Sequence, residues 1–278
     1  MERTSHLPSA ERLSTLTAVI LLAYTLSRFI NIPDRVFVLK ILGISLDFNF
    51  NIRTIIVILV VGITASGVDW LIRDHPDFKS RRTFQHWLLP SLTAWIIGFP
   101  LYQLPLGPYW WTSFVLGGGL IAIVLISEYI TIDPQDIRQP IATALLTAVS
   151  FAIFLILGFF VHYAGVRLLF ILPAIFLASG LVSLRTLNLR LPERWAFPEA
   201  GIIALIACQL AASLHYWPMS PFSYGLTLLG FTYAITGFFA NLADSQPIRK
   251  AIIEPGLIAL LIFGFAYLYR YTLCFSSH

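Results

Sequence analysis

Charged residues are scarce in this chain. Only 12% of its 278 residues are Asp, Glu, Lys or Arg, whereas a water-soluble domain carries about a quarter. So few charges cannot cover a surface that faces water, which excludes an ordinary soluble domain and favours a protein solvated by lipid. The net charge of +4 is also small, and we expect no nucleic-acid partner.

Cysteines and the motifs of common enzymes are equally scarce. The two cysteines, Cys208 and Cys274, lie far apart in the chain and form no CxxC or Cys/His spacing. This argues against a disulfide framework and against a zinc site. The sequence contains no P-loop, HExxH or GxSxG motif, which disfavours the membrane enzymes that such motifs mark. We therefore expect no cofactor.

Long apolar stretches are what the chain has instead. A helix rises about 1.5 Å per residue, so roughly 20 residues cross the hydrocarbon core of a bilayer. Nine stretches approach this length, at 14–32, 54–72, 87–104, 109–130, 140–162, 166–184, 199–216, 222–241 and 251–270. The sequence therefore predicts an all-α membrane protein, a bundle of about nine transmembrane helices in one polytopic domain over residues 1–278.

The basic residues of the loops predict the orientation of the bundle. With residues 1–13 as a cytoplasmic tail, twelve Lys and Arg residues lie on the inner side and five on the outer side. Arg28 lies inside the first stretch and completes the eighteen. Cytoplasmic loops carry the excess of Lys and Arg, so we expect an N-in, C-out protein. The longest inner loops, near 73–86 and 185–198, are expected to be short basic turns against anionic lipid headgroups.

One outer segment, residues 33–53, is too long for a tight turn. From Ile44 to Asn51 apolar and polar residues alternate strictly, which is typical of a half-buried strand. The preceding VFVLKI is rich in β-branched and apolar residues, and Gly43 separates the two runs. The pattern predicts a small extracytoplasmic β-hairpin. It either rests on the headgroups between the first two helices, or covers an outward cavity or offers an edge to a partner.

Small residues indicate where the helices pack. Membrane helices associate where small residues let their backbones approach closely. We expect packing faces at Gly62 and Ser66, and at the run Gly117–Gly119. Gln209 is the one strongly polar, non-hydroxyl side chain near the middle of a stretch, and we expect it to hydrogen-bond to a neighbouring helix.

Acidic residues at the inner ends of the stretches are the candidates for chemistry. Asp69 ends the second stretch, Glu128 ends the fourth and Glu254 opens the ninth. Two interpretations remain open for them. Asp69 and Arg73 are four residues apart and can pair on one helix face. Alternatively, the three carboxylates converge on an inner cavity, where they would act as catalytic groups with Mg²⁺ and a phosphate-bearing substrate.

Further acidic residues in the inner loops extend the second interpretation. The candidate metal ligands are Asp69, Asp74, Asp133 and Asp136. Acidic inner loops between nine spans resemble the membrane prenyltransferases, which use aspartate-rich motifs, Mg²⁺ and isoprenoid diphosphates. The chain departs from that pattern in the spacing of its first acidic run, and Glu193 is the only acid in the loop after the sixth stretch.

A second resemblance covers most of the chain. The segments SGVDWLIRDHP, WIIGFPLYQLPLGPYWW, EYITIDPQD, GVRLLFILPAIFLASGLVSLRTLNL and LHYWPMSPFSYGLTLLG resemble a family of bacterial multi-span membrane proteins of unknown function. The resemblance implies a plasma-membrane location and assigns no residue roles.

Three classes of function remain open from the sequence. The first is a non-catalytic membrane component or subunit that packs with lipids or other membrane proteins, which the scarcity of charge inside the spans favours. The second is a transporter or lipid flippase, which needs a polar site at the midplane. The third is a lipid or prenyl transferase at the inner carboxylates. An enzyme is the less favoured of these interpretations.

Overall fold

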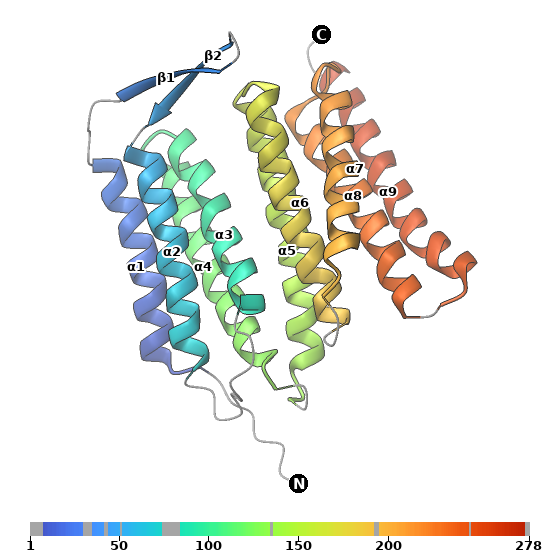
Figure 1. The fold of residues 1–278 in the computed structure, drawn as a ribbon, viewed down its shortest axis with the longest axis horizontal. Coiled ribbons are helices and arrows are strands. Elements are labelled where there is room, and N and C mark those ends of the chain that lie inside the picture. The colour runs from blue at the N-terminus through green and yellow to red at the C-terminus, as the bar shows by residue number, and fades with distance from the viewer. Residues whose placement is uncertain are drawn as a thin grey trace. The chain divides into compact units, whose positions relative to one another are not determined.

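The computed structural model describes residues 8–29, 35–41, 44–50, 52–73, 84–133, 136–191, 195–244 and 246–275. Long helices joined by short connections make up most of this part of the chain (Figure 1). They are α1 (Ala10–Phe29), α2 (Ile52–Ile72), α3 (Phe84–Gln103), α4 (Pro108–Ile130), α5 (Gln139–Tyr163), α6 (Leu168–Arg190), α7 (Phe197–His215), α8 (Pro221–Ala243) and α9 (Ile248–Phe275).

Seven of these helices, α2 and α4 to α9, are long and apolar enough to cross a membrane. The chain is a multi-pass membrane protein. Each of the nine predicted stretches coincides with a helix, but α1 and α3 are not among the seven candidates found in the described residues. Their composition explains the difference. The first turn of α1 holds Glu11 and Arg12, and α3 begins with Gln85 and His86 and contains two prolines.

Two strands lie between α1 and α2, within the segment where the alternation predicts a hairpin. They are β1 (Arg35–Ile41) and β2 (Ile44–Phe50), and they pair antiparallel with Arg35 opposite Phe50 and Ile41 opposite Ile44. The intervening residues 42–43 lie outside the described residues.

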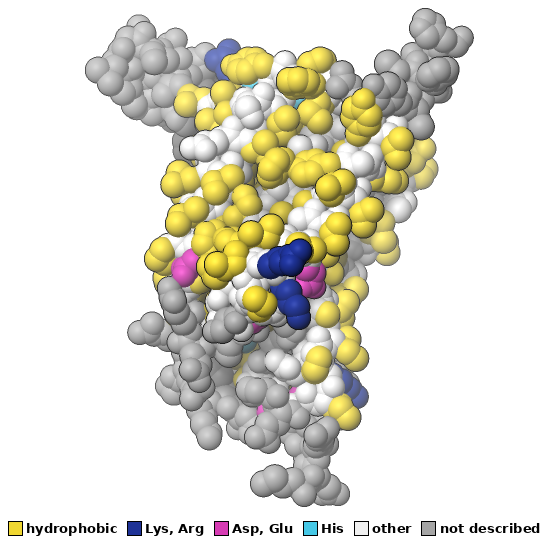
Figure 2. Space-filling view, turned by 90° about the vertical axis from the view of Figure 1, so that its right-hand side faces the viewer, with side chains coloured by type: hydrophobic (Ala, Val, Ile, Leu, Met, Phe, Trp, Pro, Cys, Tyr) yellow, Lys and Arg dark blue, Asp and Glu magenta, His cyan; other side chains and the backbone are white. Residues whose placement is uncertain are grey.

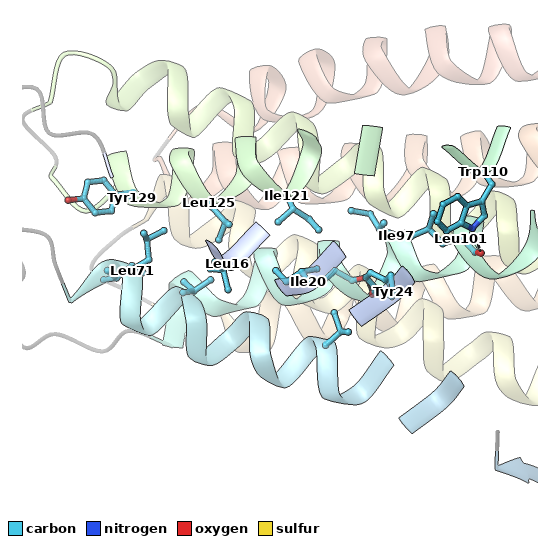
Figure 3. Packing of buried hydrophobic residues seen from close by; sticks show 14 residues of the cluster. Leu16, Ile20, Tyr24, Leu71, Ile97, Leu101, Trp110, Ile121, Leu125 and Tyr129 are labelled. Carbon is cyan, nitrogen blue, oxygen red and sulfur yellow. Dashed lines mark hydrogen bonds between the residues drawn. The ribbon is translucent and has the colours of Figure 1, made fainter. Parts of the chain in front are cut away.

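The chain divides into two compact units, Met1–Gln139 and Pro140–His278. In the first unit, α1 packs against α2, α3 and α4, and α3 packs against both α2 and α4. Figure 3 shows the apolar core of this unit, which runs from Leu71 and Tyr129 at one end to Leu101 and Trp110 at the other. In the second unit, α6 packs against α7, and α8 packs against α6, α7 and α9.

The outer surface is largely apolar, as a surface solvated by lipid must be. Figure 2 shows hydrophobic side chains over most of the described part of one face, with few charged groups among them. Among the most exposed large side chains of the second unit are Leu260 and Leu261 on α9, at 69% and 74% exposure. Lipid contact with the helices follows from this surface.

Glycines allow close helix contacts, in part where the sequence predicts them. A Cβ atom on Gly117 or Gly118 would lie 2.7 or 2.8 Å from a side chain of a neighbouring helix, so the predicted packing face on α4 is confirmed at these two glycines, whereas a Cβ on Gly119 would meet nothing within 4 Å. The predicted face at Gly62 and Ser66 is wrong for the described residues. Both are exposed, and a Cβ on Gly62 would meet nothing within 4 Å. The close contact of α2 with α1 lies instead at Gly67, which points about 140° away from Gly62 around the helix axis, because each residue turns the helix by about 100°.

Candidate functional site

A buried histidine–glutamate pair lies in the first unit. His86 is in the first turn of α3 and Glu128 is near the last turn of α4. The Nδ1 atom of His86 lies 2.8 Å from Oε2 of Glu128, and the two residues are 7% and 1% exposed. The other ring nitrogen of His86 lies 3.1 Å from Nε2 of Gln85. Glu128 is thus held inside the protein by a partner from another helix.

His86 is a site residue that the sequence analysis missed, because it falls in the predicted loop 73–86. A signal did exist. Helices α3 and α4 are joined by a turn of only four residues, so they must run antiparallel. The start of α3 therefore lies beside the end of α4, and a polar residue at one faces a polar residue at the other.

The predicted pairing of Asp69 with Arg73 is confirmed. Oδ2 of Asp69 lies 2.7 Å from Nε of Arg73, one helical turn further along the chain. The side chain of Arg73 is 69% exposed and that of Asp69 is 17% exposed. An ion pair this open to solvent contributes little to stability. It nevertheless engages one oxygen of the carboxylate that the catalytic interpretation requires, while Oδ1 of Asp69 is buried without a hydrogen-bond partner among the described residues.

Two candidate metal ligands lie in the loop between α4 and α5, and one of them is hydrogen-bonded within that loop. Asp136 is buried, and its Oδ1 accepts a hydrogen bond of 2.8 Å from the backbone N–H of Arg138. Asp133 is half-buried in the same loop. Asp74 lies outside the described residues. Within the described ranges, no three His, Cys, Asp or Glu side chains are grouped so that they could hold a metal ion.

Glu254, the third catalytic candidate, belongs to the second unit. It lies in the second turn of α9, and its side chain is exposed. The convergence of Glu254 with Asp69 and Glu128 stays a prediction.

The second unit contains polar contacts that the sequence analysis also missed. Helix α6 continues to Arg190, so Arg185 is 2% exposed rather than part of the predicted basic turn at 185–198. Its Nη1 donates to Oδ1 of Asn188 at 3.2 Å. Two further contacts join α6 to α8: Ser183 Oγ lies 3.1 Å from Thr236 Oγ1, and Arg190 Nη1 donates to Asn241 Oδ1 at 3.3 Å.

Hydroxyl groups inside the helices mostly bond to their own backbone. Thr64, Thr93 and Ser150 are fully buried, and each donates 2.7 Å to the carbonyl four residues earlier. Such groups are satisfied within one helix and need no ligand. The expectation that Gln209 bonds to a neighbouring helix is wrong for the described residues, because Gln209 is exposed on α7.

These contacts join helices and cap loops. Glu128, Asp69 and Asp136 each have a partner in the protein, and Ser183 and Thr236, which join α6 to α8, are both buried. The contacts of Glu128 with His86 and of Ser183 with Thr236 join different helices, and buried polar contacts of this kind hold a membrane bundle together.

Comparison with known proteins places the chain beside a family of unknown function. The model of a protein family described as "Protein of unknown function (DUF5656)" matches residues 32–269. No curated protein and no solved structure matches the chain.

Proposed function

Because the chain belongs to DUF5656, a family of unknown function, we propose its role from its own contacts: it is a non-catalytic membrane component that assembles with other membrane proteins and lipids. A helical membrane protein of this kind contributes packing surface instead of a reaction centre.

The engagement of the inner carboxylates is the observation that carries this proposal. A general base or a Mg²⁺ ligand must present a carboxylate to substrate or metal. Glu128 is 1% exposed and lies against His86, and Asp69 lies against Arg73. Freeing Glu128 would leave a buried carboxyl group without its partner, which costs several kcal/mol, about 3–5 where a buried ion pair is broken.

The proposal includes nine membrane crossings with the N-terminus inside. Helix α3 lies beside the membrane-span candidate α4 at both ends. His86 meets Glu128 at one end, and the indole N–H of Trp110 donates 3.1 Å to the carbonyl of Leu101 at the other. Likewise, Arg12 at the start of α1 donates 3.3 Å to the carbonyl of Trp70 near the end of α2. A helix that accompanies a spanning neighbour end to end crosses the same thickness of lipid.

The proposed location is the bacterial plasma membrane, with β1 and β2 on the outer side. The excess of Lys and Arg in the loops on the opposite side supports this orientation.

The test compares the wild type with a triple variant, Asp69→Asn, Glu128→Gln and Glu254→Gln, which keeps side-chain size and removes the three carboxylates. Each protein is reconstituted in lipid nanodiscs and titrated with Mg²⁺ by calorimetry. In parallel, each is expressed in cells from which the gene has been deleted, and membrane complexes are resolved on native gels. We expect no saturable Mg²⁺ binding and the same complexes for both proteins.

Two outcomes contradict the proposal. Saturable Mg²⁺ binding that the triple variant loses would indicate a metal-dependent transferase. Migration of the wild type as a single chain in every native gel would remove the assembly role. Equal accumulation of both proteins in the membrane is the control for folding.

A further inference from the structure

Gln209 lies on the outside of α7, within the part of the helix that crosses the membrane. It is twelve residues from Phe197 and six from His215, or roughly 18 and 9 Å along the axis. Its side chain is exposed. An amide is thus presented to hydrocarbon, away from the helices of its own unit.

The side-chain amide of Gln209 still requires a polar partner at this depth. Exposed hydroxyl groups on the spans can hydrogen-bond to the backbone of their own helix. Ser66 and Ser213 do so by donating to the carbonyl three residues earlier. The Gln209 amide carries two N–H donors and a carbonyl acceptor. Among the described residues it takes part in no side-chain hydrogen bond. Lipid tails offer neither donors nor acceptors, so the amide is unsatisfied until another polar group reaches it.

The residues along the same row of α7 leave room for another helix. Gly201, Leu205 and Ser213 are spaced four residues apart in line with Gln209. A Cβ on Gly201 would meet nothing within 4 Å, Leu205 is 56% exposed and Ser213 is exposed. Gly201 and Ser213 are the small residues of this row, and small residues let the backbones of two membrane helices approach closely.

We infer that the Gln209 face of α7, formed by Gly201, Leu205, Gln209 and Ser213, joins two copies of this chain. The inference rests on the proposed assembly function and names the partner. An amide is self-complementary, since its N–H can donate to the carbonyl of an identical amide and accept from it in return. A two-fold axis at Gln209 therefore satisfies both copies with one residue type, whereas a different partner would need its own polar group at that depth.

The first experiment measures association in lipid. Wild-type chains carrying donor or acceptor fluorophores are reconstituted into vesicles of phosphatidylethanolamine and phosphatidylglycerol, and energy transfer is followed as protein is diluted with lipid. We expect a dimer. Gln209→Leu should raise its dissociation constant about tenfold, because interhelical hydrogen bonds in membranes are worth roughly 1–2 kcal/mol.

A second variant tests the face without touching the amide. Gly201→Leu fills the open position and should weaken the dimer, while Gly264→Leu fills an equally open position on α9 and should not. In a Cys208→Ala, Cys274→Ala background, Gln209→Cys should form an intermolecular disulfide with copper phenanthroline. Leu261→Cys, at a position that is 74% exposed on α9, is the control that should not.

The outcomes separate this inference from the proposed function. A wild type that is monomeric in vesicles, or a dimer unaffected by both Gln209→Leu and Gly201→Leu, overturns the pairing of two copies. If native gels still show complexes with other membrane proteins, the proposed function stands without it. Saturable Mg²⁺ binding at the carboxylates would instead contradict the proposed function and leave the dimer measurement intact.

Discussion

Nδ1 of His86 lies 2.8 Å from Oε2 of Glu128, although 42 residues separate them in the chain. The pair joins the start of α3 to the end of α4, and both residues are buried. Helix α3 contains two prolines, each of which removes a backbone hydrogen bond. We therefore infer that the pair fixes the position of a helix whose own backbone is weakened.

The first prediction concerns the energy of this pair. His86→Ala and Glu128→Ala should each lower the free energy of unfolding by about 3–5 kcal/mol, because each leaves a buried polar partner behind. The double variant should lose less than the sum of the two, with a coupling energy of about 1–3 kcal/mol. Equilibrium unfolding in mixed detergent micelles measures all four proteins of the cycle.

The pair of Asp69 and Arg73, in which the arginine is 69% exposed, provides the control for that cycle. Asp69→Ala and Arg73→Ala should give a coupling energy below about 1 kcal/mol, since solvent around the arginine screens the interaction. A coupling at His86 and Glu128 no larger than the one at Asp69 and Arg73 would show that the buried pair does not anchor α3.

The second prediction concerns the contact of α4 with α1. A Cβ on Gly118 would lie 2.8 Å from Cδ1 of Leu21, whereas a Cβ on the next residue, Gly119, would meet nothing within 4 Å. Gly118→Ile should therefore destabilise the protein by about 1–3 kcal/mol through overpacking. Gly119→Ile should stay within about 0.5 kcal/mol of the wild type. Thermal unfolding in detergent distinguishes them, and equal shifts would contradict the packing of α1 on α4.

Local patterns account for what the sequence predicts correctly. The positions of the nine helices in the described part of the chain follow from runs of apolar residues, and the pairing of Asp69 with Arg73 follows from a spacing of one helical turn. Both depend only on residues close together in the chain. The contact of His86 with Glu128 depends on how two helices meet, so a list of polar residues along the chain does not reveal it.

The choice of helix face is the other feature that the sequence does not fix. Helix α2 has small residues at Gly62, Ser66 and Gly67. Of these three, Gly67 faces α1, whereas Gly62 and Ser66 are exposed. In the same way, Gln209 is polar and near the middle of α7, yet it lies on the outside. In lipid, both the inner and the outer faces of a helix are apolar, so the hydrophobic pattern that distinguishes them in soluble proteins is missing.

The third prediction tests whether α3 crosses the membrane. Single cysteines are introduced at Arg73 and Leu106, which are both exposed, in a Cys208→Ala, Cys274→Ala background. An impermeant maleimide should label Leu106→Cys in intact cells and Arg73→Cys only after permeabilisation. Ile137→Cys, in an exposed position after α4, should behave like Arg73→Cys. Labelling of Arg73→Cys and Leu106→Cys from the same side would contradict a crossing by α3.

The fourth prediction concerns the hydrogen bond at the other end of α3. The backbone carbonyl of Leu101 would normally accept from the residue four positions later, but that residue is Pro105, which has no N–H. The indole N–H of Trp110, from the first turn of α4, donates to this carbonyl at 3.1 Å, and Trp110 is 2% exposed. The tryptophan thus satisfies a buried acceptor that the proline leaves open.

Trp110→Phe should lower the free energy of unfolding by about 1–3 kcal/mol, because the buried carbonyl loses its donor and the smaller ring leaves a gap. Its neighbour Trp111 is 57% exposed, so Trp111→Phe should change stability by less than about 0.5 kcal/mol. Equilibrium unfolding of both variants, monitored by far-ultraviolet circular dichroism, measures the difference. Equal stability of the two variants would mean that the carbonyl of Leu101 finds another donor, and that α3 is not held to α4 at this end.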